Sequence, residues 1–155
     1  MSNLFSDTPL WNMLNGASTI DEGVIWIETI SQKQTRKFIV KLNTDQMRYD
    51  FINAEGVPLA SIGGPYSPFT VREGNKAGPD SVDLYDTGEF HESFKVKNIT
   101  KKSFDIVSDP IKDDGTNLLD EWGDEIEGLT FESIDALVVY LTPLYQQKLM
   151  RKLGV

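Results

Sequence analysis

The sequence contains no cysteine and only one histidine among its 155 residues. The missing cysteines exclude disulfide bonds, thiolate catalysis and every metal site built on thiolates. A single histidine excludes sites that need two, such as the paired histidines of a zincin helix. Because small secreted domains often depend on disulfides, their absence favours an intracellular protein.

Long apolar runs are also missing. Residues 1–7 have neither the basic region nor the apolar region of a signal peptide. No run approaches the roughly 20 apolar residues that are needed to span a bilayer. We therefore expect a soluble protein made in a cytoplasm, without a membrane partner. The glycosylation sequon at residues 98–100 is then an accident of composition.

Negative charge dominates and is concentrated in one segment. The chain has 24 acidic and 15 basic residues, a formal net charge of −9. Residues 109–135 contain one base, Lys112, and ten acids: Asp109, Asp113, Asp114, Asp120, Glu121, Asp124, Glu125, Glu127, Glu132 and Asp135. This segment carries the whole net charge, because the remaining acids and bases balance. General affinity for nucleic acid requires clustered Lys and Arg, so that function is disfavoured.

Two smaller basic clusters interrupt the neutral part of the chain. They consist of Lys33, Arg36, Lys37 and Lys41, and of Lys95, Lys97, Lys101 and Lys102. One interpretation is that they form solvated faces. The other is that they receive the acidic segment of a neighbouring copy of the chain.

The length predicts one domain, with a core supplied by eight Phe, five Tyr and three Trp residues. We divide the chain into an N-terminal arm, residues 1–16, and a single α+β domain, residues 17–155. In the arm, Thr8 is a candidate N-cap, Pro9 fits the first helical position, and Asn15-Gly16 is a candidate stop. The apolar arm either packs on its own domain or docks on a partner.

Thr19 and Glu22 have the spacing of a capping box, which predicts a helix over residues 20–33. Residues 38–42 could continue that helix or form a short strand, and periodicity does not decide between them.

Residues 53–80 hold five of the twelve glycines and four of the seven prolines. Such a density disfavours regular helices and central strands. We therefore predict a long extended loop, and such loops are usually either disordered or functional. Tyr66 and Phe69 within it favour a loop that docks on something.

Alternating patterns follow the loop. Residues 82–85 alternate in part, and two cleaner runs predict an antiparallel hairpin at about residues 94–107. The side chains expected to face the core are Phe94, Val96, Phe104 and Ile106. The predicted fold class is α+β, with this small sheet packed by N-terminal and C-terminal helices.

Two helical stripes end the chain. The first, on an acidic helix, comprises Leu118, Trp122, Ile126 and Leu129; the second comprises Phe131, Ile134, Val138 and Leu141. Thr142-Pro143 is expected to restart or kink the second helix, because proline lacks a backbone donor. Leu144, Tyr145, Leu149 and Leu153 continue it.

Few residues suggest chemistry. His91 has no motif around it and is interpreted as a structural or surface histidine. Glu89 and Glu92 are spaced as a carboxylate pair, but a chain with 24 acids produces such pairs by chance. The acids between residues 109 and 117 lack the alternation and final glutamate of a calcium loop. No phosphate-binding or dinucleotide-binding glycine motif occurs. We expect no catalytic residue, no metal and no cofactor.

The most distinctive run is Leu84-Tyr85-Asp86-Thr87-Gly88-Glu89-Phe90-His91-Glu92-Ser93-Phe94-Lys95-Val96. It resembles the L-x-D-T-G-x-[LF]-x-x-S-[FI]-x-V pattern of tail-completion and head–tail joining proteins of tailed phages. Further upstream, residues 42–56 and 64–70 are similar to related proteins of Bacteroidetes phages, including the crAss-like group. The resemblance covers roughly residues 38–130.

The motif also predicts a structural corner on physical grounds. Asp86 could accept hydrogen bonds from the amides that follow it, and Gly88 permits a turn with positive φ. Phe90 and Phe94 lie four residues apart and share a face of one helical turn. The corner residues are Leu84, Asp86, Thr87, Gly88, Phe90, Ser93 and Phe94.

The resemblance implies a virion protein that forms a ring below the portal and joins it to the tail. In such a ring, one patch of each copy meets a different patch of the next. The implied partners are copies of the chain, the portal, other neck or tail proteins, and DNA that passes without specific binding. Candidate partner contacts are Leu10, Trp11, Leu14, Tyr66 and Phe69. The acids expected to face the DNA channel and repel phosphates are Asp113, Asp114, Asp120, Glu121, Asp124 and Glu125.

Two other functions compete with this one. A monomeric adaptor or DNA-mimicking inhibitor would bind a basic protein through the acidic face, in a salt-sensitive way. A hydrolase with unrecognised carboxylates would need an acidic pair with a raised pKa in one cleft.

Overall fold

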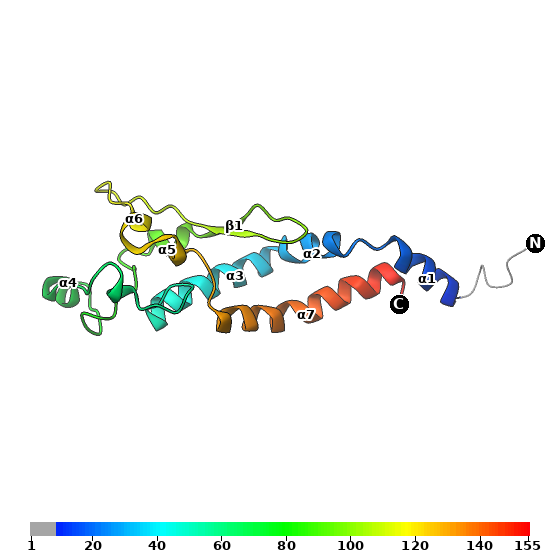
Figure 1. Ribbon diagram of the computed structural model, residues 1–155, viewed down its shortest axis with the longest axis horizontal. Coiled ribbons are helices and arrows are strands. Elements are labelled where there is room, and N and C mark those ends of the chain that lie inside the picture. The colour runs from blue at the N-terminus through cyan, green and yellow to red at the C-terminus, as the bar shows by residue number, and fades with distance from the viewer. Residues whose placement is uncertain (1–8) are drawn as a thin grey trace, which may run out of the picture.

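The computed structural model describes residues 9–155 and has an α+β fold, as predicted. The molecule is elongated, with α1 (Pro9–Thr19) and the C-terminus at one end and α4 (Pro68–Glu73) at the other (Figure 1). Between them lie α2 (Glu22–Ile30), α3 (Lys33–Asp45), α5 (Glu89–Ser93), β1 (Lys95–Lys97), β2 (Asp105–Val107), α6 (Leu118–Trp122) and α7 (Phe131–Leu153). Short turns of π-helix (Gln46–Asp50) and 3₁₀ helix (Leu59–Ser61 and Asp124–Ile126) connect them.

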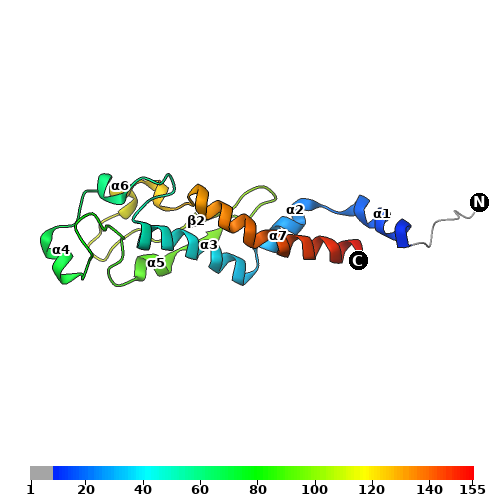
Figure 2. The same ribbon diagram turned by 90° about the horizontal axis from the view of Figure 1, so that it is seen from below.

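The middle of the molecule is layered. Helix α3 contacts both β1 and α7, and the hairpin and α7 lie on different sides of it (Figures 1 and 2). The core fills the space between these layers, and its fully buried members include Ile30, Ile39, Met47 and Leu59.

The N-terminal helices differ from the prediction at their ends. Helix α1 runs through Asn15-Gly16 to Thr19, so the predicted stop is wrong. The Thr19 hydroxyl donates to the Gly16 carbonyl at 2.9 Å, and Asp21 caps α2 by accepting from the amides of Gly23 and Val24. The predicted capping box is therefore wrong as well. Thr8, the candidate N-cap of the arm, lies outside the described residues.

The helix predicted over residues 20–33 is the shorter α2, and a turn at residues 31–32 separates it from α3, which begins at Lys33. Residues 38–42 belong to α3, which resolves the ambiguity in favour of helix. Phe38 stacks on Tyr140 of α7, with ring centroids 4.3 Å apart, so α3 joins the layers through aromatic contact as well as through Ile39.

The segment 53–80 contains more regular structure than predicted. The Asn53 carboxamide oxygen accepts from the amides of Glu55 and Val57 and closes a tight turn. Pro68 starts α4, where a proline costs no hydrogen bond, and Ser67 caps the helix by accepting from the Thr70 amide at 3.1 Å. The prediction that the segment contains no regular helix is therefore wrong for residues 68–73.

The hairpin is confirmed. Val96 pairs with Ile106 in an antiparallel register, and both are buried together with Phe94. Phe104 is half-buried against Trp26 of α2, with ring centroids 6.4 Å apart. Residues 82–85 are not a strand, which corrects the prediction there, because side chains rather than a neighbouring strand satisfy their amides.

The acidic stretch 118–129 is not one helix. Gly123, with φ of 81°, ends α6, and a separate 3₁₀ turn follows. Because the break turns the chain, Leu118 and Ile126 are still buried. The apolar positions are thus confirmed as core, and the single-helix geometry is corrected.

Helix α7 continues through Pro143, so the proline does not restart it. The predicted second stripe is wrong as a core face: Leu141 is buried, but Phe131, Ile134 and Val138 are exposed. Leu137 and Leu141 are the residues that α7 buries, because α2 and α3 pack against that side of the helix. An apolar strip therefore remains uncovered on α7.

Candidate functional site

The motif at residues 84–96 forms the predicted corner. Gly88 has φ of 97° and stands directly before α5. The rings of Phe90 and Phe94 share a face, with centroids 5.0 Å apart and planes at 72°. The Ser93 hydroxyl donates to the Phe90 carbonyl at 2.6 Å and accepts from the Asp109 amide at 2.9 Å, so it joins α5 to the chain that follows β2.

Two details of the corner were not predicted. Asp86 is exposed, and the amide acceptors at the corner are Thr87, for the Glu89 amide, and Asp83, for the Tyr85 amide. The role expected of Asp86 is thus corrected to Asp83. Leu84 is buried with φ of 51°, a left-handed conformation that places its side chain in the core.

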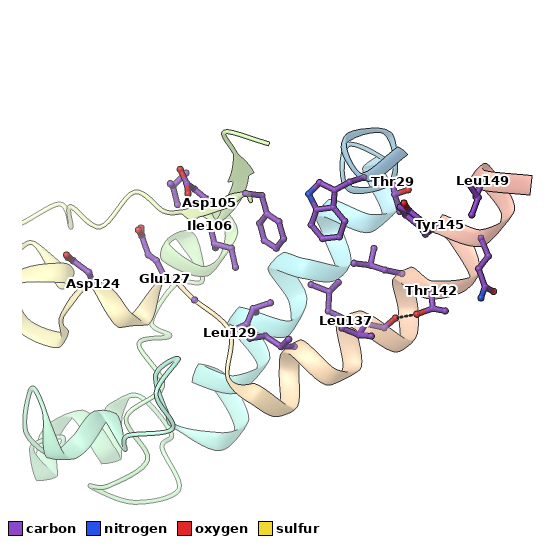
Figure 3. A pocket seen from close by; sticks show the side chains of 18 residues that line it. Thr29, Asp105, Ile106, Asp124, Glu127, Leu129, Leu137, Thr142, Tyr145 and Leu149 are labelled. Carbon is purple, nitrogen blue, oxygen red and sulfur yellow. Dashed lines mark hydrogen bonds between the residues drawn. The ribbon is translucent and has the colours of Figure 1, made fainter. Parts of the chain in front are cut away.

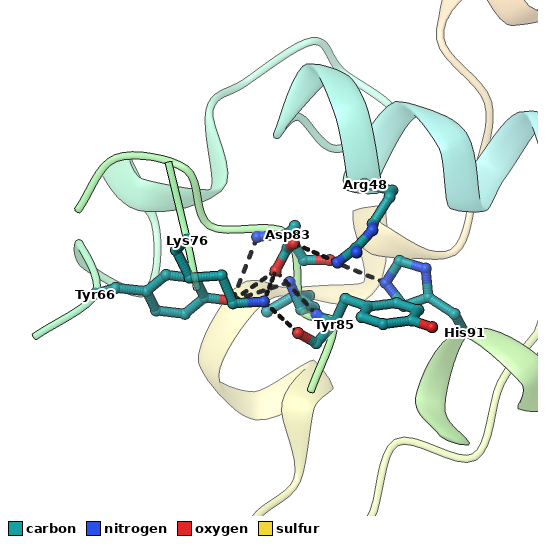
Figure 4. A network of polar contacts seen from close by, with 7 residues as sticks. Arg48, Tyr66, Lys76, Asp83, Tyr85 and His91 are labelled. Atoms are coloured by element: carbon teal, nitrogen blue, oxygen red, sulfur yellow. Dashed lines mark hydrogen bonds and ion pairs between the residues drawn. The ribbon is translucent and has the colours of Figure 1, made fainter. Parts of the chain in front are cut away.

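Asp83 is the centre of a set of polar contacts that we call the Asp83 network: Arg48, Tyr66, Lys76, Asp83, Tyr85 and His91 (Figure 4). The Asp83 side chain is 7% exposed. It accepts from Arg48 at 2.6 Å and from Lys76 at 2.8 Å. The Tyr66 hydroxyl, at 3.1 Å, and the Tyr85 amide, also at 3.1 Å, complete its donors.

The network joins segments that are far apart in the sequence. Arg48 belongs to the turn after α3, and its guanidinium lies 3.6 Å from the centroid of the Tyr85 ring. Lys76 follows α4 and also donates to the Tyr85 carbonyl. The His91 Nε2 atom is 2.9 Å from the Asp83 carbonyl oxygen, so it donates there. The long segment 53–80 is therefore fastened to the corner and to the end of α3.

The electrostatics of the network suit a structural role. Burial alone raises the pKa of Asp83, but the Lys76 hydrogen bond and charge and the Tyr85 amide outweigh it and hold that pKa below its usual value. Burial beside Asp83 raises the pKa of Tyr66 to about 12, and burial lowers the pKa of His91. A carboxylate that is held ionised by two cations is a poor general base or acid, because its pKa lies far from neutral pH. His91 is placed as a buried structural histidine.

Replacing Gly88 tests whether the corner requires a residue that readily adopts a positive φ. A Cβ atom there would lie 2.9 Å from the Tyr85 hydroxyl oxygen, and L-residues disfavour φ of 97°. We expect Gly88→Ala to lower the free energy of unfolding by about 1–2 kcal/mol in urea denaturation. Gly115→Ala is the matched control for backbone strain alone, because its φ is 85° and a Cβ there meets no atom within 4 Å. Equal losses in the two variants would show that the Tyr85 contact adds nothing.

A second feature is a groove of about 1250 Å³ beside α7, which we call the α7 groove (Figure 3). Ile134, Leu137, Val138 and Leu141 line it from α7, and Trp26 of α2 and Phe104 before β2 also line it. Asp124 and Glu127 stand at one end. Uncovered apolar walls of this kind are typical of surfaces that contact other proteins.

A third feature, the basic groove, lies on the other side of the hairpin. Its residues are Lys33, Arg36, Lys37 and Val40 of α3, and Phe94, Lys95, Val96 and Lys97 at β1. The structure brings together two basic clusters that are 60 residues apart in the sequence. The remaining members of the two clusters, Lys41, Lys101 and Lys102, do not line it. Lys41 and Lys101 pair instead with Asp45 and Asp21.

The residues predicted to contact a partner differ in how exposed they are. Leu10 and Leu14 of α1 are exposed, as is Phe69 at 67% on α4. The side chain of Trp11 lies outside the described residues. Tyr66 is half-buried, and its hydroxyl is bound to Asp83. Tyr66 therefore anchors the loop on its own domain through its hydroxyl.

The six acids predicted to face a channel are all exposed: Asp113, Asp114, Asp120, Glu121, Asp124 and Glu125. Within residues 9–155, none of them forms an ion pair. Glu127 is different, because its carboxylate accepts from the amide and the hydroxyl of Ser108, both at 2.6 Å. Its structural role had no signal in the sequence pattern.

Comparisons of the chain with protein-family models, with curated proteins and with solved structures found no match. Among the described residues, no helix has the length and apolar character to cross a membrane, and no cluster of three or more His, Asp or Glu side chains is arranged for a metal ion.

Proposed function

We propose that the chain is a structural subunit that assembles with copies of itself into a ring, in the neck between the portal and the tail of a tailed phage. The observation that carries the assembly is the exposed apolar surface of α7, where Phe131 is 85% and Val139 75% exposed. The cost of leaving such groups in water favours a partner that covers them. The phage location is supported by the motif at residues 84–96.

The contacts of the Asp83 network support the same function. The Asp83 network directs its donors and acceptors at one another and at the backbone. It holds the loop and α4 at the far end of an elongated molecule (Figure 1). A subunit that contacts several neighbours benefits when such segments are already held in place, because binding then costs less conformational entropy.

The exposed acids of residues 113–125 extend the proposal to the channel. Unpaired carboxylates on a ring lumen would repel DNA phosphates and let the duplex pass. The same unpaired acids also favour the second candidate, a monomeric adaptor that binds a basic protein. The two differ in where the chain resides: a neck subunit is found in virions, and an adaptor is found free in infected cells.

Purified virions test the function. We expect the chain to co-purify with intact virions at a fixed ratio to the portal, measured by quantitative mass spectrometry. Cryo-electron microscopy of the neck should then place Asp120 and Glu121 at the lumen. Absence from virions, with the free chain bound to a basic protein, would contradict the neck assignment. Presence at the neck with these acids outside would remove the channel role alone.

A further inference from the structure

We propose that the basic groove of one copy receives the beginning of α7 from the next copy. The inference rests on the proposed function, since it supplies the contact between copies that a ring requires. The basic groove is lined by five cations together with Val40, Phe94 and Val96. Phe94 and Val96 are themselves almost fully buried, so the cations make up most of its accessible lining. Within the part of the chain that the structure describes, none of the five cations forms an ion pair.

The outer face of α7 has the matching chemistry. Phe131, Asp135 and Val139 follow one another at four-residue spacing and so share a face, with Glu132 beside them. Phe131 and Val139 are exposed, and neither Glu132 nor Asp135 has an ion-pair partner in residues 9–155. A helix whose apolar side chains are flanked by acids fits a groove that is lined mainly by cations, because the acids can pair with those cations.

The layered fold requires the partner to be a second molecule. Helix α3 has β1 and the basic groove on one side and α7 on another, so α7 cannot fold over into the groove of its own chain (Figures 1 and 2). The contact joins two different patches and is therefore heterologous. Each added copy leaves the same pair of patches free at the two ends, which is the condition for a closed ring or a filament.

A nucleic acid is the other molecule that could bind in the basic groove, because phosphates pair with clustered cations. The chain has a net charge of −9, and this charge lies in residues 109–135, which include the start of α7. That charge repels a phosphate backbone, while it attracts the basic groove of another copy. The observations therefore favour the acidic start of α7, with Glu132 and Asp135, as the segment bound in the basic groove.

Cysteine crosslinking tests the contact, because the chain has no cysteine of its own. Ala136→Cys marks the outer face of α7, and Gln34→Cys marks α3 beside the basic groove; both positions are exposed. We expect mixtures of the two full-length variants to form a disulfide-linked dimer at least about tenfold faster than mixtures of Ala136→Cys with Glu73→Cys, an exposed position on α4 at the end of the molecule (Figure 1). The double variant should form a ladder of oligomers.

Reversing the charges on each surface distinguishes crosslinking through a specific contact from crosslinking through random collision. Glu132→Lys with Asp135→Lys, added to the Ala136→Cys chain, should reduce the crosslinking rate about tenfold, and Lys33→Glu with Lys37→Glu on the other chain should restore it. Phe131→Ser should reduce the rate by a similar factor without changing the unfolding midpoint, because the side chain is 85% exposed in the single molecule.

Four outcomes would overturn the inference. They are a rate equal to that of the control pair, a rate insensitive to charge exchange, preferential linkage of Ala136→Cys to itself, and salt-sensitive binding of duplex DNA that Lys33→Glu with Lys37→Glu abolishes. Any of these, combined with the chain's presence at the neck of virions, would leave the proposed function intact with a different contact. Specific crosslinking by a chain that is absent from virions would support the contact and contradict the neck location.

Discussion

Replacing Asp83 with asparagine is expected to lower the free energy of unfolding by about 3 kcal/mol. The change removes the carboxylate that neutralises Lys76, whose side chain is 9% exposed, and Arg48, which is partly exposed. A buried cation without its partner is costly, because water no longer solvates it. Urea denaturation followed by tryptophan fluorescence measures the loss.

Asp86→Asn is the matched control for this substitution. Asp86 lies three residues further along the same corner, is exposed, and makes no ion pair among the described residues. We expect its replacement to change the free energy of unfolding by less than about 0.5 kcal/mol. Equal effects of the two substitutions would show that the Asp83 network does not hold the loop.

The pH dependence provides a second measurement on Asp83. Because the pKa of Asp83 is lowered in the folded protein from its ordinary value of 3.8, the unfolded chain binds more protons in that range. The contribution of Asp83 to stability is therefore present above pH 3.8 and is lost as the pH falls through the folded value. The Asp83→Asn variant should not lose this contribution as the pH falls. Plotted against pH, the free energies of unfolding of the variant and of the original protein should therefore converge at acidic pH. Parallel curves would contradict the assignment.

Gln46→Met is expected to lower the free energy of unfolding by about 3 kcal/mol, because it removes three hydrogen bonds of a side chain that is 2% exposed. The Gln46 Nε2 atom donates to the Gly128 carbonyl at 2.7 Å, and its Oε1 atom accepts from the Thr130 amide at 3.1 Å and the Ser133 hydroxyl at 3.2 Å. These contacts fix the start of α7. Methionine has a similar length and leaves the backbone groups unsatisfied.

Gln34→Met on the exposed side of α3 is the control, and it should be nearly neutral. Hydrogen exchange should locate the damage: amides of residues 128–133 should exchange faster in Gln46→Met, while those of the hairpin should not. An undiminished stability, or faster exchange spread over the whole chain, would contradict the local role of Gln46.

Local patterns were sufficient for several elements. The alternation around Phe94 and Ile106 predicted the hairpin, because a strand with one buried face repeats every two residues. Gly88 and the spacing of Phe90 and Phe94 predicted the corner, because those preferences act within one turn of chain.

The Asp83 network had no such signal. Asp83 lies in a partly alternating run that suggested a strand, and its partners Arg48 and Tyr66 are 35 and 17 residues away. Only the folded chain brings these charges into one buried place. The same applies to the basic groove, whose two halves are separate clusters in the sequence.

The sequence by itself determined that the chain forms amphipathic helices, one hairpin and a strongly acidic segment, because each depends on neighbours within a few residues. The tertiary structure alone decided which side of α7 is covered. Phe131 and Leu141 belong to the same apolar repeat, yet α2 and α3 bury only the second. A periodic pattern specifies that a helix has an apolar face, and packing of distant segments determines how much of that face remains for another molecule.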